Sequence, residues 1–275
     1  MQAHISYPPN IDEPTLPGQL FTAAHQFRVH GCLWLENSFA RQKVLALQDQ
    51  FLREYASQDL AEVQKNCLHV GHKRYMFTVR IEGAFADPDI FAAPRVMPVV
   101  ESLLGKDCVL QSVGVVCAFP GAGMQHIHRD HPNLFEEASG LNSFLPPFAL
   151  HVVIPLVDLT EETGTTALWE GSHRLRNKAA EIETSDEKML TEKGVVLPWP
   201  KLGDSYFMDF RLKHAGTANH SAIPRPILYL VYSRRWFQDR KNYESRRQKP
   251  VDISRMEYER LPEQHRHLFE NAVPE

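Results

Sequence analysis

The stretch Gln125-His126-Ile127-His128-Arg129-Asp130 carries the most information in this chain, and it follows an apolar, β-branched run from Val109 to Ala118. His128 and Asp130 are two residues apart, and positions i and i+2 of a β-strand point to the same side of a sheet. An imidazole and a carboxylate placed in this way can reach one metal ion. The spacing therefore predicts a strand that carries two metal ligands.

A third ligand and an anion clamp are predicted far downstream. His214 comes shortly after the strand-like run from Ser205 to Phe210, and it is the best candidate for a second imidazole. Two histidines and one carboxylate can hold non-haem Fe(II) and leave coordination positions open. Arg225 follows 11 residues later (225 − 214) and precedes the strand-like run from Pro226 to Tyr232. Its guanidinium can clamp a carboxylate with two parallel hydrogen bonds.

Other interpretations of these residues compete with this one. The three histidines between positions 126 and 131 can be surface residues of a polar loop, and His126 shares a strand face with His128, so spacing alone leaves it open as a ligand. A cupin-type pair of His126 and His128 requires a glutamate four or five residues later, where Pro132 and Asn133 stand. A mononuclear zinc hydrolase uses the same ligand types, but it would give Arg225 no function.

The order of the predicted elements favours a mainly β protein with flanking helices. Helices are expected at residues 19–30, at 38–55 with Ser38 as the cap, and at 88–104, while residues 56–88 are expected to be irregular. Helices followed by many short strands are typical of a β-sandwich or barrel with helices outside it, and a jelly roll fits this order. The strands are expected at residues 32–35, 109–118, 148–156, 166–169, 205–210 and 226–232, and one helix is expected in the tail at 251–275.

Composition excludes several classes of protein. The formal net charge of −4 gives no electrostatic footprint for nucleic acid or an anionic membrane. No run approaches the roughly 20 apolar residues of a membrane span, and the N-terminus lacks a signal-peptide pattern. The four cysteines form no CxxC pair, which predicts a reduced, cytoplasmic protein. They are Cys32, Cys67, Cys108 and Cys117.

Three segments of the chain resemble the phytanoyl-CoA dioxygenase family of Fe(II)/2-oxoglutarate oxygenases. They are residues 119–130, residues 163–174 and residues 214–225, and they come in the order and at the separations of that family. The resemblance covers roughly residues 105–240. Residues 145–148, 169–173 and 235–237 are most similar to the bacterial antibiotic-biosynthesis members of the family.

The resemblance implies a fold, a cofactor and a set of roles. The fold is a double-stranded β-helix, the cupin-like form of the jelly roll, in one oxygenase domain over residues 1–275. A mainly helical part at 1–105 supports a catalytic core at 106–238, and a tail at 239–275 follows. Fe(II) is held by His128, Asp130 and His214. Arg225 and Thr166 hold the distal carboxylate of 2-oxoglutarate, with the adjacent Thr165 open as an alternative, and Gln125 contacts the same cosubstrate.

The implied reaction uses O2 and 2-oxoglutarate to oxidise a C–H bond of a small molecule, and it releases succinate and CO2. Ascorbate is expected to support it. Halogenases of this superfamily lack the ligand carboxylate, so Asp130 argues for hydroxylation or another C–H oxidation. A non-catalytic jelly roll that binds a small molecule or a metal is the alternative from another class.

The sequence says less about the substrate. The mouth of the pocket is expected from residues 65–80 and 132–147. Glu136 and Glu137 would suit an amine-rich sugar, whereas Lys73 and Arg74 would suit a coenzyme A ester. The partner is expected to be a small molecule of secondary metabolism.

Overall fold

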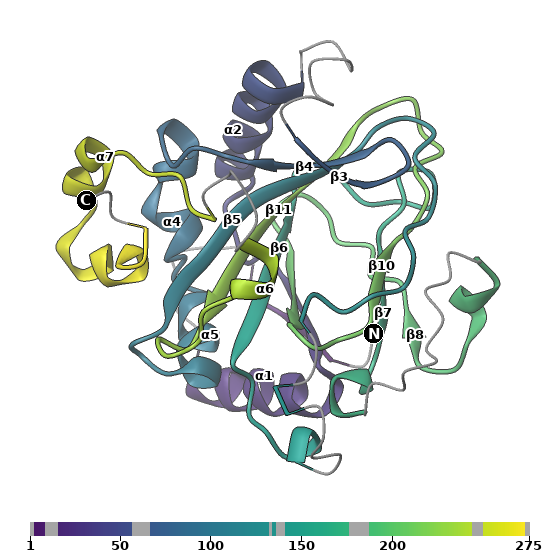
Figure 1. The fold of residues 1–275 in the computed structure, drawn as a ribbon, viewed down its shortest axis with the longest axis horizontal. Coiled ribbons are helices and arrows are strands. Elements are labelled where there is room, and N and C mark those ends of the chain that lie inside the picture. The colour runs from purple at the N-terminus through teal and green to yellow at the C-terminus, as the bar shows by residue number, and fades with distance from the viewer. Residues whose placement is uncertain are drawn as a thin grey trace.

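Two β-sheets organise the computed structural model, which describes residues 3–8, 16–56, 67–131, 134–135, 141–175, 187–243 and 250–272. The large sheet has eight strands in the order β1-β2-β9-β6-β11-β5-β4-β3, and the small sheet has three in the order β10-β7-β8 (Figure 1). The strands are β1 (His4–Ser6), β2 (Cys32–Glu36), β3 (Leu68–Gly71), β4 (Arg74–Thr78), β5 (Val109–Ala118), β6 (Ala149–Pro155), β7 (Thr166–Trp169), β8 (Val195–Val196), β9 (Ser205–Asp209), β10 (His214–Gly216) and β11 (Arg225–Ser233).

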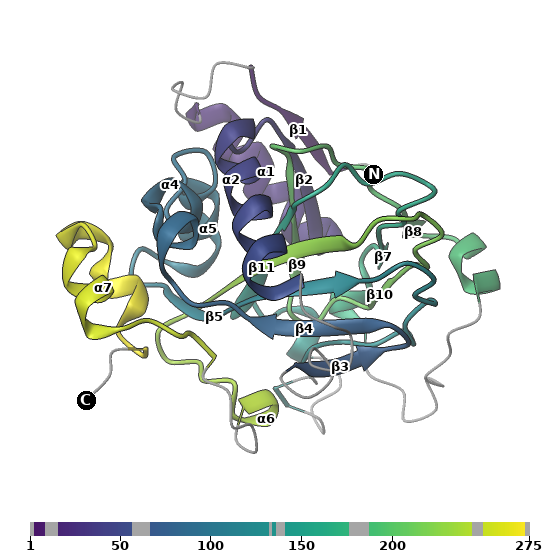
Figure 2. The same cartoon turned by 90° about the horizontal axis from the view of Figure 1, so that it is seen from above.

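Helices α1 (Pro17–His30), α2 (Arg41–Phe51), α4 (Pro88–Phe91) and α5 (Met97–Leu104) cover one face of the large sheet, as Figures 1 and 2 show from two directions. The two further α-helices are α6 (Arg240–Tyr243), which lies toward the other face, and α7 (Arg255–Arg260). A π-helical turn at Leu52–Ala56 extends α2, and 3-10 turns lie at Gly83–Ala86, Leu141–Ser143, Ser172–Arg174, Glu187–Thr191 and Glu263–Phe269.

Alternation along the central strands separates two interiors. In β6, Leu150, Val152 and Ile154 belong to the main hydrophobic core, which also contains residues of α1, α2 and α5. The intervening Val153 packs in a second cluster with Leu168 of the small sheet. Because successive side chains of a strand point to opposite faces, the helices pack on one face of β6 and the small sheet packs on the other.

This arrangement confirms the predicted fold class, which is mainly β with flanking helices around a jelly-roll core. The predicted strands at 32–35, 109–118, 148–156, 166–169, 205–210 and 226–232 are all present within two residues of their expected ends. Their apolar, β-branched sequences suit strands that are buried on both faces. The expected helix at 19–30 is α1, and it ends at Gly31, which has a left-handed φ of 76°.

Three local predictions were wrong. The helix expected at 88–104 is two helices, α4 and α5, because Pro94 cannot continue a helical hydrogen-bond ladder. Ser38 does not cap α2, whose N-cap is Ala40. The Ser38 hydroxyl instead contacts the Ser205 hydroxyl at 2.8 Å. The segment expected to be irregular contains the antiparallel hairpin of β3 and β4, which extends the large sheet beyond β5.

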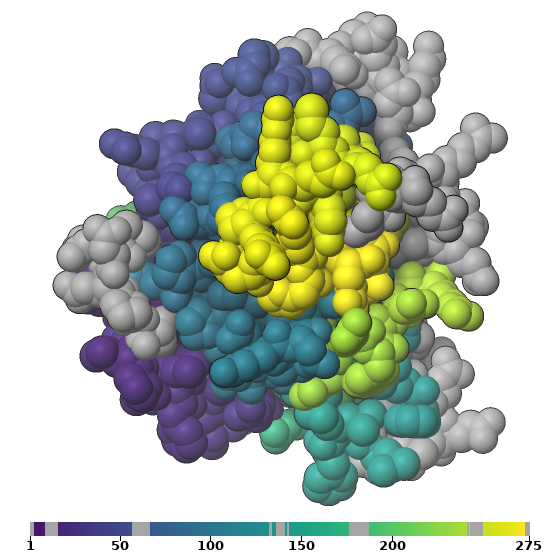
Figure 3. Space-filling model, turned by 90° about the vertical axis from the view of Figure 1, so that its left-hand side faces the viewer, coloured from purple at the N-terminus to yellow at the C-terminus, as the bar shows by residue number. Residues whose placement is uncertain are grey.

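The C-terminal segment lies over the helical side of the molecule. Figure 3 shows the yellow C-terminal residues spread across the blue and teal surface of the earlier chain. The ring of Phe269 contacts that of Phe91 edge to face at 4.9 Å, and both are fully buried. The expected single helix of the tail is α7 followed by the 3-10 turn Glu263–Phe269. Among the helices in the described ranges, none has the length and apolar character that crossing a bilayer requires.

Candidate metal centre

His128 and His214 face each other across one isolated antiparallel bridge. The amide of each donates to the carbonyl oxygen of the other, at 3.0 Å from His128 and 2.9 Å from His214. His214 begins β10, but residues around His128 form no further ladder, so the strand predicted for residues 126–130 is a single bridge pair. Together with two hydrogen bonds between Gln125 and the backbone of Gly216, each 2.9 Å long, this pair brings two segments 86 residues apart (214 − 128) into register at the end of the small sheet.

The three candidate ligands converge on one point. One ligand atom from each of His128, Asp130 and His214 lies within 4.8 Å of the others. Nε2 of His128 is 3.7 Å from Asp130 Oδ1, and Nε2 of His214 is 3.5 Å from Asp130 Oδ2. Two imidazoles and one carboxylate within this distance can share one first-row divalent metal ion.

The histidine tautomers suit metal binding. Nδ1 of His128 lies 2.9 Å from the carbonyl oxygen of His126, and Nδ1 of His214 lies 3.0 Å from that of Leu212. A carbonyl oxygen only accepts, so each Nδ1 carries the proton and each Nε2 presents a lone pair toward Asp130. Backbone partners of this kind fix the ring orientation of metal-bound histidines in general. The residues present therefore fit a mononuclear iron site.

Charge in the cluster also favours a cation. Burial lowers the pKa of His214 to about 4, so its ring is neutral at pH 7 and free to act as a ligand. Burial alone would raise the pKa of Asp130, but His214, His151 and His128 outweigh it and hold that pKa well below its usual range. The carboxylate is therefore ionised over the whole physiological range.

The cluster opens into a cavity of about 610 Å³ between the sheets. Strands β3, β5 and β11 supply its walls, with Val70, Val116 and Val231 among the apolar side chains. Asp239 and Asn242, from the segment after β11, complete it. The metal ligands lie at one side of a partly apolar hollow of the size that small-molecule sites have. We call this hollow the metal cavity.

Arg225 and Thr166 lie behind the metal cavity in a buried polar cluster. Arg225 is 1% exposed and donates to the carbonyl oxygens of Thr163 and Thr165 at 3.0 and 3.3 Å. Its Nε has no hydrogen-bond partner among the described residues. The hydroxyl of Tyr206 lies 2.8 Å from that of Thr166.

Tyr229 connects this cluster to the metal cavity. It interacts with the Thr166 hydroxyl, and it also lines the cavity, which Arg225 and Thr166 do not. Burial raises the pKa of Tyr229, so its phenol remains a hydrogen-bond donor at neutral pH. The buried guanidinium and the hydroxyl groups around it form a set of donors suited to a carboxylate.

The structure separates the two adjacent threonines and engages Gln125. The Thr165 hydroxyl donates to the carbonyl oxygen of Pro198 at 2.5 Å, whereas the Thr166 hydroxyl accepts from Tyr206 at 2.8 Å, so only the carbonyl oxygen of Thr165 contacts Arg225. Gln125 lines the metal cavity, but both ends of its amide are bonded, to the Val70 carbonyl at 2.8 Å and to the Gly216 amide at 2.9 Å. It links β3 to β10.

Two residues at the centre were not foreseen from the sequence. Nε2 of His151, on β6, lies 2.7 Å from Asp130 Oδ2, and Nδ2 of Asn242 donates to the Asp130 carbonyl oxygen at 3.0 Å. His151 carried a signal, because it is the single polar side chain within an apolar strand at 149–155. His126 lines the cavity but does not belong to the ligand set.

The expected mouth is only partly as predicted. Residues Leu68 to Gly71 and Met76 line the metal cavity, but Lys73 donates to the Pro120 carbonyl and Arg74 is buried away from it. The described residues of 132–147 do not line the cavity, and Phe144 is 87% exposed. Glu136 and Glu137 lie outside the described residues.

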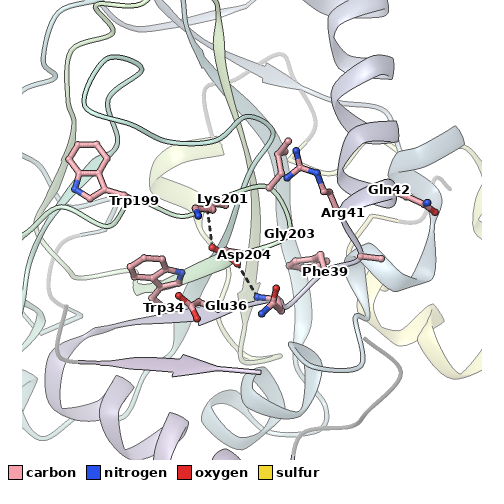
Figure 4. A pocket seen from close by; sticks show the side chains of 12 residues that line it. Trp34, Glu36, Phe39, Arg41, Gln42, Trp199, Lys201, Gly203 and Asp204 are labelled. Atoms are coloured by element: carbon pink, nitrogen blue, oxygen red, sulfur yellow. Dashed lines mark hydrogen bonds between the residues drawn. The ribbon is translucent and has the colours of Figure 1, made fainter. Parts of the chain in front are cut away.

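A second hollow, of about 660 Å³, lies beside β2 and the loop before β9 (Figure 4). Trp34 and Trp199 line it, with Glu36, Arg41, Lys201 and Asp204 around them. We call it the tryptophan hollow. Figure 4 shows Asp204 in the middle of the lining residues, where it accepts the backbone amides of Asn37 and Lys201, each at 2.9 Å.

Solved structures share this fold at low sequence identity. The non-heme alpha ketoglutarate dependent epimerase SnoN from nogalamycin biosynthesis matches with a TM-score of 0.62 and 19% identity, over 80% of this chain and 82% of SnoN. HygX from Streptomyces hygroscopicus, with nickel, 2-oxoglutarate and hygromycin B bound, matches with a TM-score of 0.60 and 15% identity, over 86% of this chain and 97% of HygX. At these identities the likeness shows the fold, including the jelly roll.

The sequence itself assigns the family. The phytanoyl-CoA dioxygenase (PhyH) family matches residues 27–227, which include all three candidate ligands and Arg225. That span is well over half of the 275 residues. The chain therefore belongs to the phytanoyl-CoA dioxygenase family and is an Fe(II)/2-oxoglutarate-dependent enzyme.

Proposed function

We propose that this enzyme oxidises a C–H bond of a small secondary metabolite, with Fe(II) held by His128, Asp130 and His214. The observation that carries the proposal is the convergence of these three ligand atoms within 4.8 Å at the side of a 610 Å³ cavity. The whole chain acts as one oxygenase domain. Its four free cysteines are in keeping with work in the cytoplasm.

Different side chains have different roles in the proposed reaction. Nε2 of His128, Nε2 of His214 and one oxygen of Asp130 would hold the metal ion. When bound, the iron couples oxidative decarboxylation of 2-oxoglutarate to oxidation of the substrate, so that substrate, O2 and 2-oxoglutarate yield oxidised substrate, succinate and CO2. Arg225 and the hydroxyls of Thr166 and Tyr229 bind the distal carboxylate. The apolar cavity walls orient the substrate and exclude water.

A secondary metabolite is the substrate class we favour. SnoN was solved in complex with Fe3+, alpha ketoglutarate and nogalamycin RO, and HygX was solved with hygromycin B. The partly apolar wall of the metal cavity, with Asp239 and Asn242 at one side, offers both packing and hydrogen bonds to such a molecule. Coenzyme A esters fit less well, because Lys73 and Arg74 are turned to backbone carbonyls.

Succinate formation tests the proposal. The enzyme is incubated in air with Fe(II), ascorbate and 2-oxoglutarate, with and without pools of secondary metabolites, and succinate is quantified. We expect slow turnover that one pool accelerates, and no turnover in Asp130→Ala. No turnover in any pool, together with no visible charge-transfer band on anaerobic addition of Fe(II) and 2-oxoglutarate, would instead favour a non-catalytic jelly roll.

The product distinguishes hydroxylation from other outcomes. SnoN is described as an epimerase, and an epimerisation returns hydrogen to carbon without adding oxygen. The reaction is therefore run in D2O and followed by mass spectrometry. Gain of one oxygen atom supports the proposed hydroxylation, whereas gain of deuterium at unchanged composition, with no added oxygen, contradicts it and indicates epimerisation.

A further inference from the structure

His151 occupies the most constrained backbone near the candidate metal centre. It lies in the middle of β6, between Met208 of β9 and Val231 of β11, so hydrogen-bond ladders hold its backbone on both sides. Its side chain is 6% exposed in an otherwise apolar strand. A polar ring in such a place costs free energy unless it has a hydrogen-bond partner, so a buried imidazole is expected to have one.

The ring of His151 lies beside Asp130. Nε2 is 2.7 Å from Asp130 Oδ2, which is a hydrogen-bond distance, but the alignment of the two groups does not complete a hydrogen bond. Phe210 packs against the ring at 5.1 Å and Tyr229 meets it edge on at 5.6 Å. Nδ1 has no hydrogen-bond partner in the described part of the chain.

Asp130 needs such support more than the other two ligands do. Each candidate ligand histidine has its Nδ1 bound to a carbonyl oxygen. Asp130 lies beyond the single bridge pair at His128, on a segment without a ladder, and Asn242 steadies only its backbone carbonyl. His151 is thus the group on a rigid strand that can fix the orientation of this carboxylate.

We propose that His151 is the positioning residue of the metal centre: its Nε2–H binds Asp130 Oδ2 and leaves Oδ1 to the metal. This inference rests on the proposed function of the three ligands. A carboxylate held in this way binds the metal through one oxygen, which keeps the remaining positions open for cosubstrate and O2. Outer partners of metal-bound carboxylates generally act so, and their removal costs about 10- to 100-fold in metal affinity or activity.

Cobalt binding to three variants tests the role without turnover. Co(II) is titrated into the wild type, His151→Leu, His151→Gln and His220→Leu, and visible absorption reports both affinity and coordination. We expect His151→Leu to bind Co(II) about 10- to 100-fold more weakly with an altered spectrum. His151→Gln keeps an N–H donor and recovers most of the affinity. His220 is an exposed histidine outside the metal cavity, so His220→Leu binds as the wild type does.

Each departure from this pattern overturns a specific claim. Unchanged affinity and spectrum in His151→Leu would show that His151 only fills the core. If His151→Leu and His151→Gln lost Co(II) affinity equally, and both had a spectrum that indicates one imidazole ligand fewer than in the wild type, His151 would be a fourth ligand instead. Failure of the wild type to bind Co(II) would overturn the proposed function itself. That result is distinguishable from both results for the His151 variants, because those require a wild type that binds Co(II).

A measurement on the unmutated protein covers the case in which His151→Leu does not fold. Nitrogen-15 spectra of the histidine rings in the Zn(II)-loaded wild type report which ring nitrogen carries the proton. We expect the proton of His151 on Nε2, where it can reach Asp130. A proton on Nδ1 alone contradicts the proposal, because Nε2 could not then donate to the carboxylate.

Discussion

The metal cavity and the tryptophan hollow are nearly equal in size, at about 610 and 660 Å³, but their polar groups are arranged in opposite ways. In the metal cavity, ligand atoms converge with their lone pairs free. In the tryptophan hollow, each oxygen of Asp204 already accepts one backbone amide, and Arg41 lies 4.0 Å from Asp158. Convergence of unsatisfied groups, rather than volume, identifies the functional hollow.

The largest difference is expected between two aspartates. Asp130→Ala removes one of three candidate ligands, so the metal affinity should fall by more than the roughly 100-fold that loss of an outer partner costs. Asp204→Ala leaves the Asn37 and Lys201 amides unbonded, so it should lower the melting temperature and leave metal affinity unchanged. Metal titration and thermal unfolding measure both. Similar metal loss in the two variants would break the comparison.

Two arginines give the next largest difference. Arg225→Met should weaken 2-oxoglutarate binding by about 2 kcal/mol or more, because a buried charge pair loses one partner. Arg41→Met, at the tryptophan hollow, removes an arginine whose side chain is 59% exposed. It should change the free energy of 2-oxoglutarate binding by less than about 1 kcal/mol. Calorimetric titration of 2-oxoglutarate into the metal-loaded protein measures each. Metal affinity without cosubstrate should stay constant in Arg225→Met, and its loss there would assign Arg225 to folding.

Two glycines extend the comparison to the backbone. Gly164 (φ +76°) and Gly203 (φ +103°) both have left-handed conformations, which cost other residues about 1–2 kcal/mol. A Cβ at Gly164 would collide with the Ala218 carbonyl and lie 2.5 Å from the Arg225 guanidinium, whereas at Gly203 it would lie 3.0 Å from the Phe39 carbonyl.

Gly164→Ala should therefore lower both the free energy of unfolding and the affinity for 2-oxoglutarate. Gly203→Ala should lower only the first, and by less. Chemical denaturation and cosubstrate titration separate the two effects. An unchanged affinity in folded Gly164→Ala would mean that the Arg225 guanidinium moves without consequence, and it would weaken the assignment of the clamp.

Local patterns in the sequence predicted most of the fold. Strands such as β5, β6 and β11 are largely apolar and rich in β-branched residues, so their composition identifies them without knowledge of their neighbours. The hairpin of β3 and β4 has no such pattern, because it contains His69 and Arg74. Arg74 is buried only because the carbonyls of distant Gly123 and Thr217 accept its N–H groups, which no local pattern reveals.

The site divides in the same way. The three candidate ligands and Arg225 could be selected from spacing and family resemblance, and the structure brings the ligands together. His151 could not be assigned, because its relation to Asp130 depends on the register of β6 with β9 and β11. Tyr206 and Tyr229 were missed for a related reason, since only the packing of β7 against the large sheet brings Thr166 to them.

The smallest expected difference is between two aromatic residues. Tyr229→Phe removes one hydroxyl from the proposed clamp and should raise the KM for 2-oxoglutarate about fivefold, which corresponds to about 1 kcal/mol for one hydrogen bond. Trp34→Phe in the tryptophan hollow removes an indole N–H that has no hydrogen-bond partner among the described residues. Relief of that buried donor offsets the lost apolar contact, so stability should change by less than about 1 kcal/mol and turnover not at all. Succinate assays and thermal unfolding check both variants.

A tenfold change of turnover in Trp34→Phe would mean that the tryptophan hollow takes part in catalysis. Convergence of unsatisfied groups would then no longer be sufficient to distinguish the two hollows.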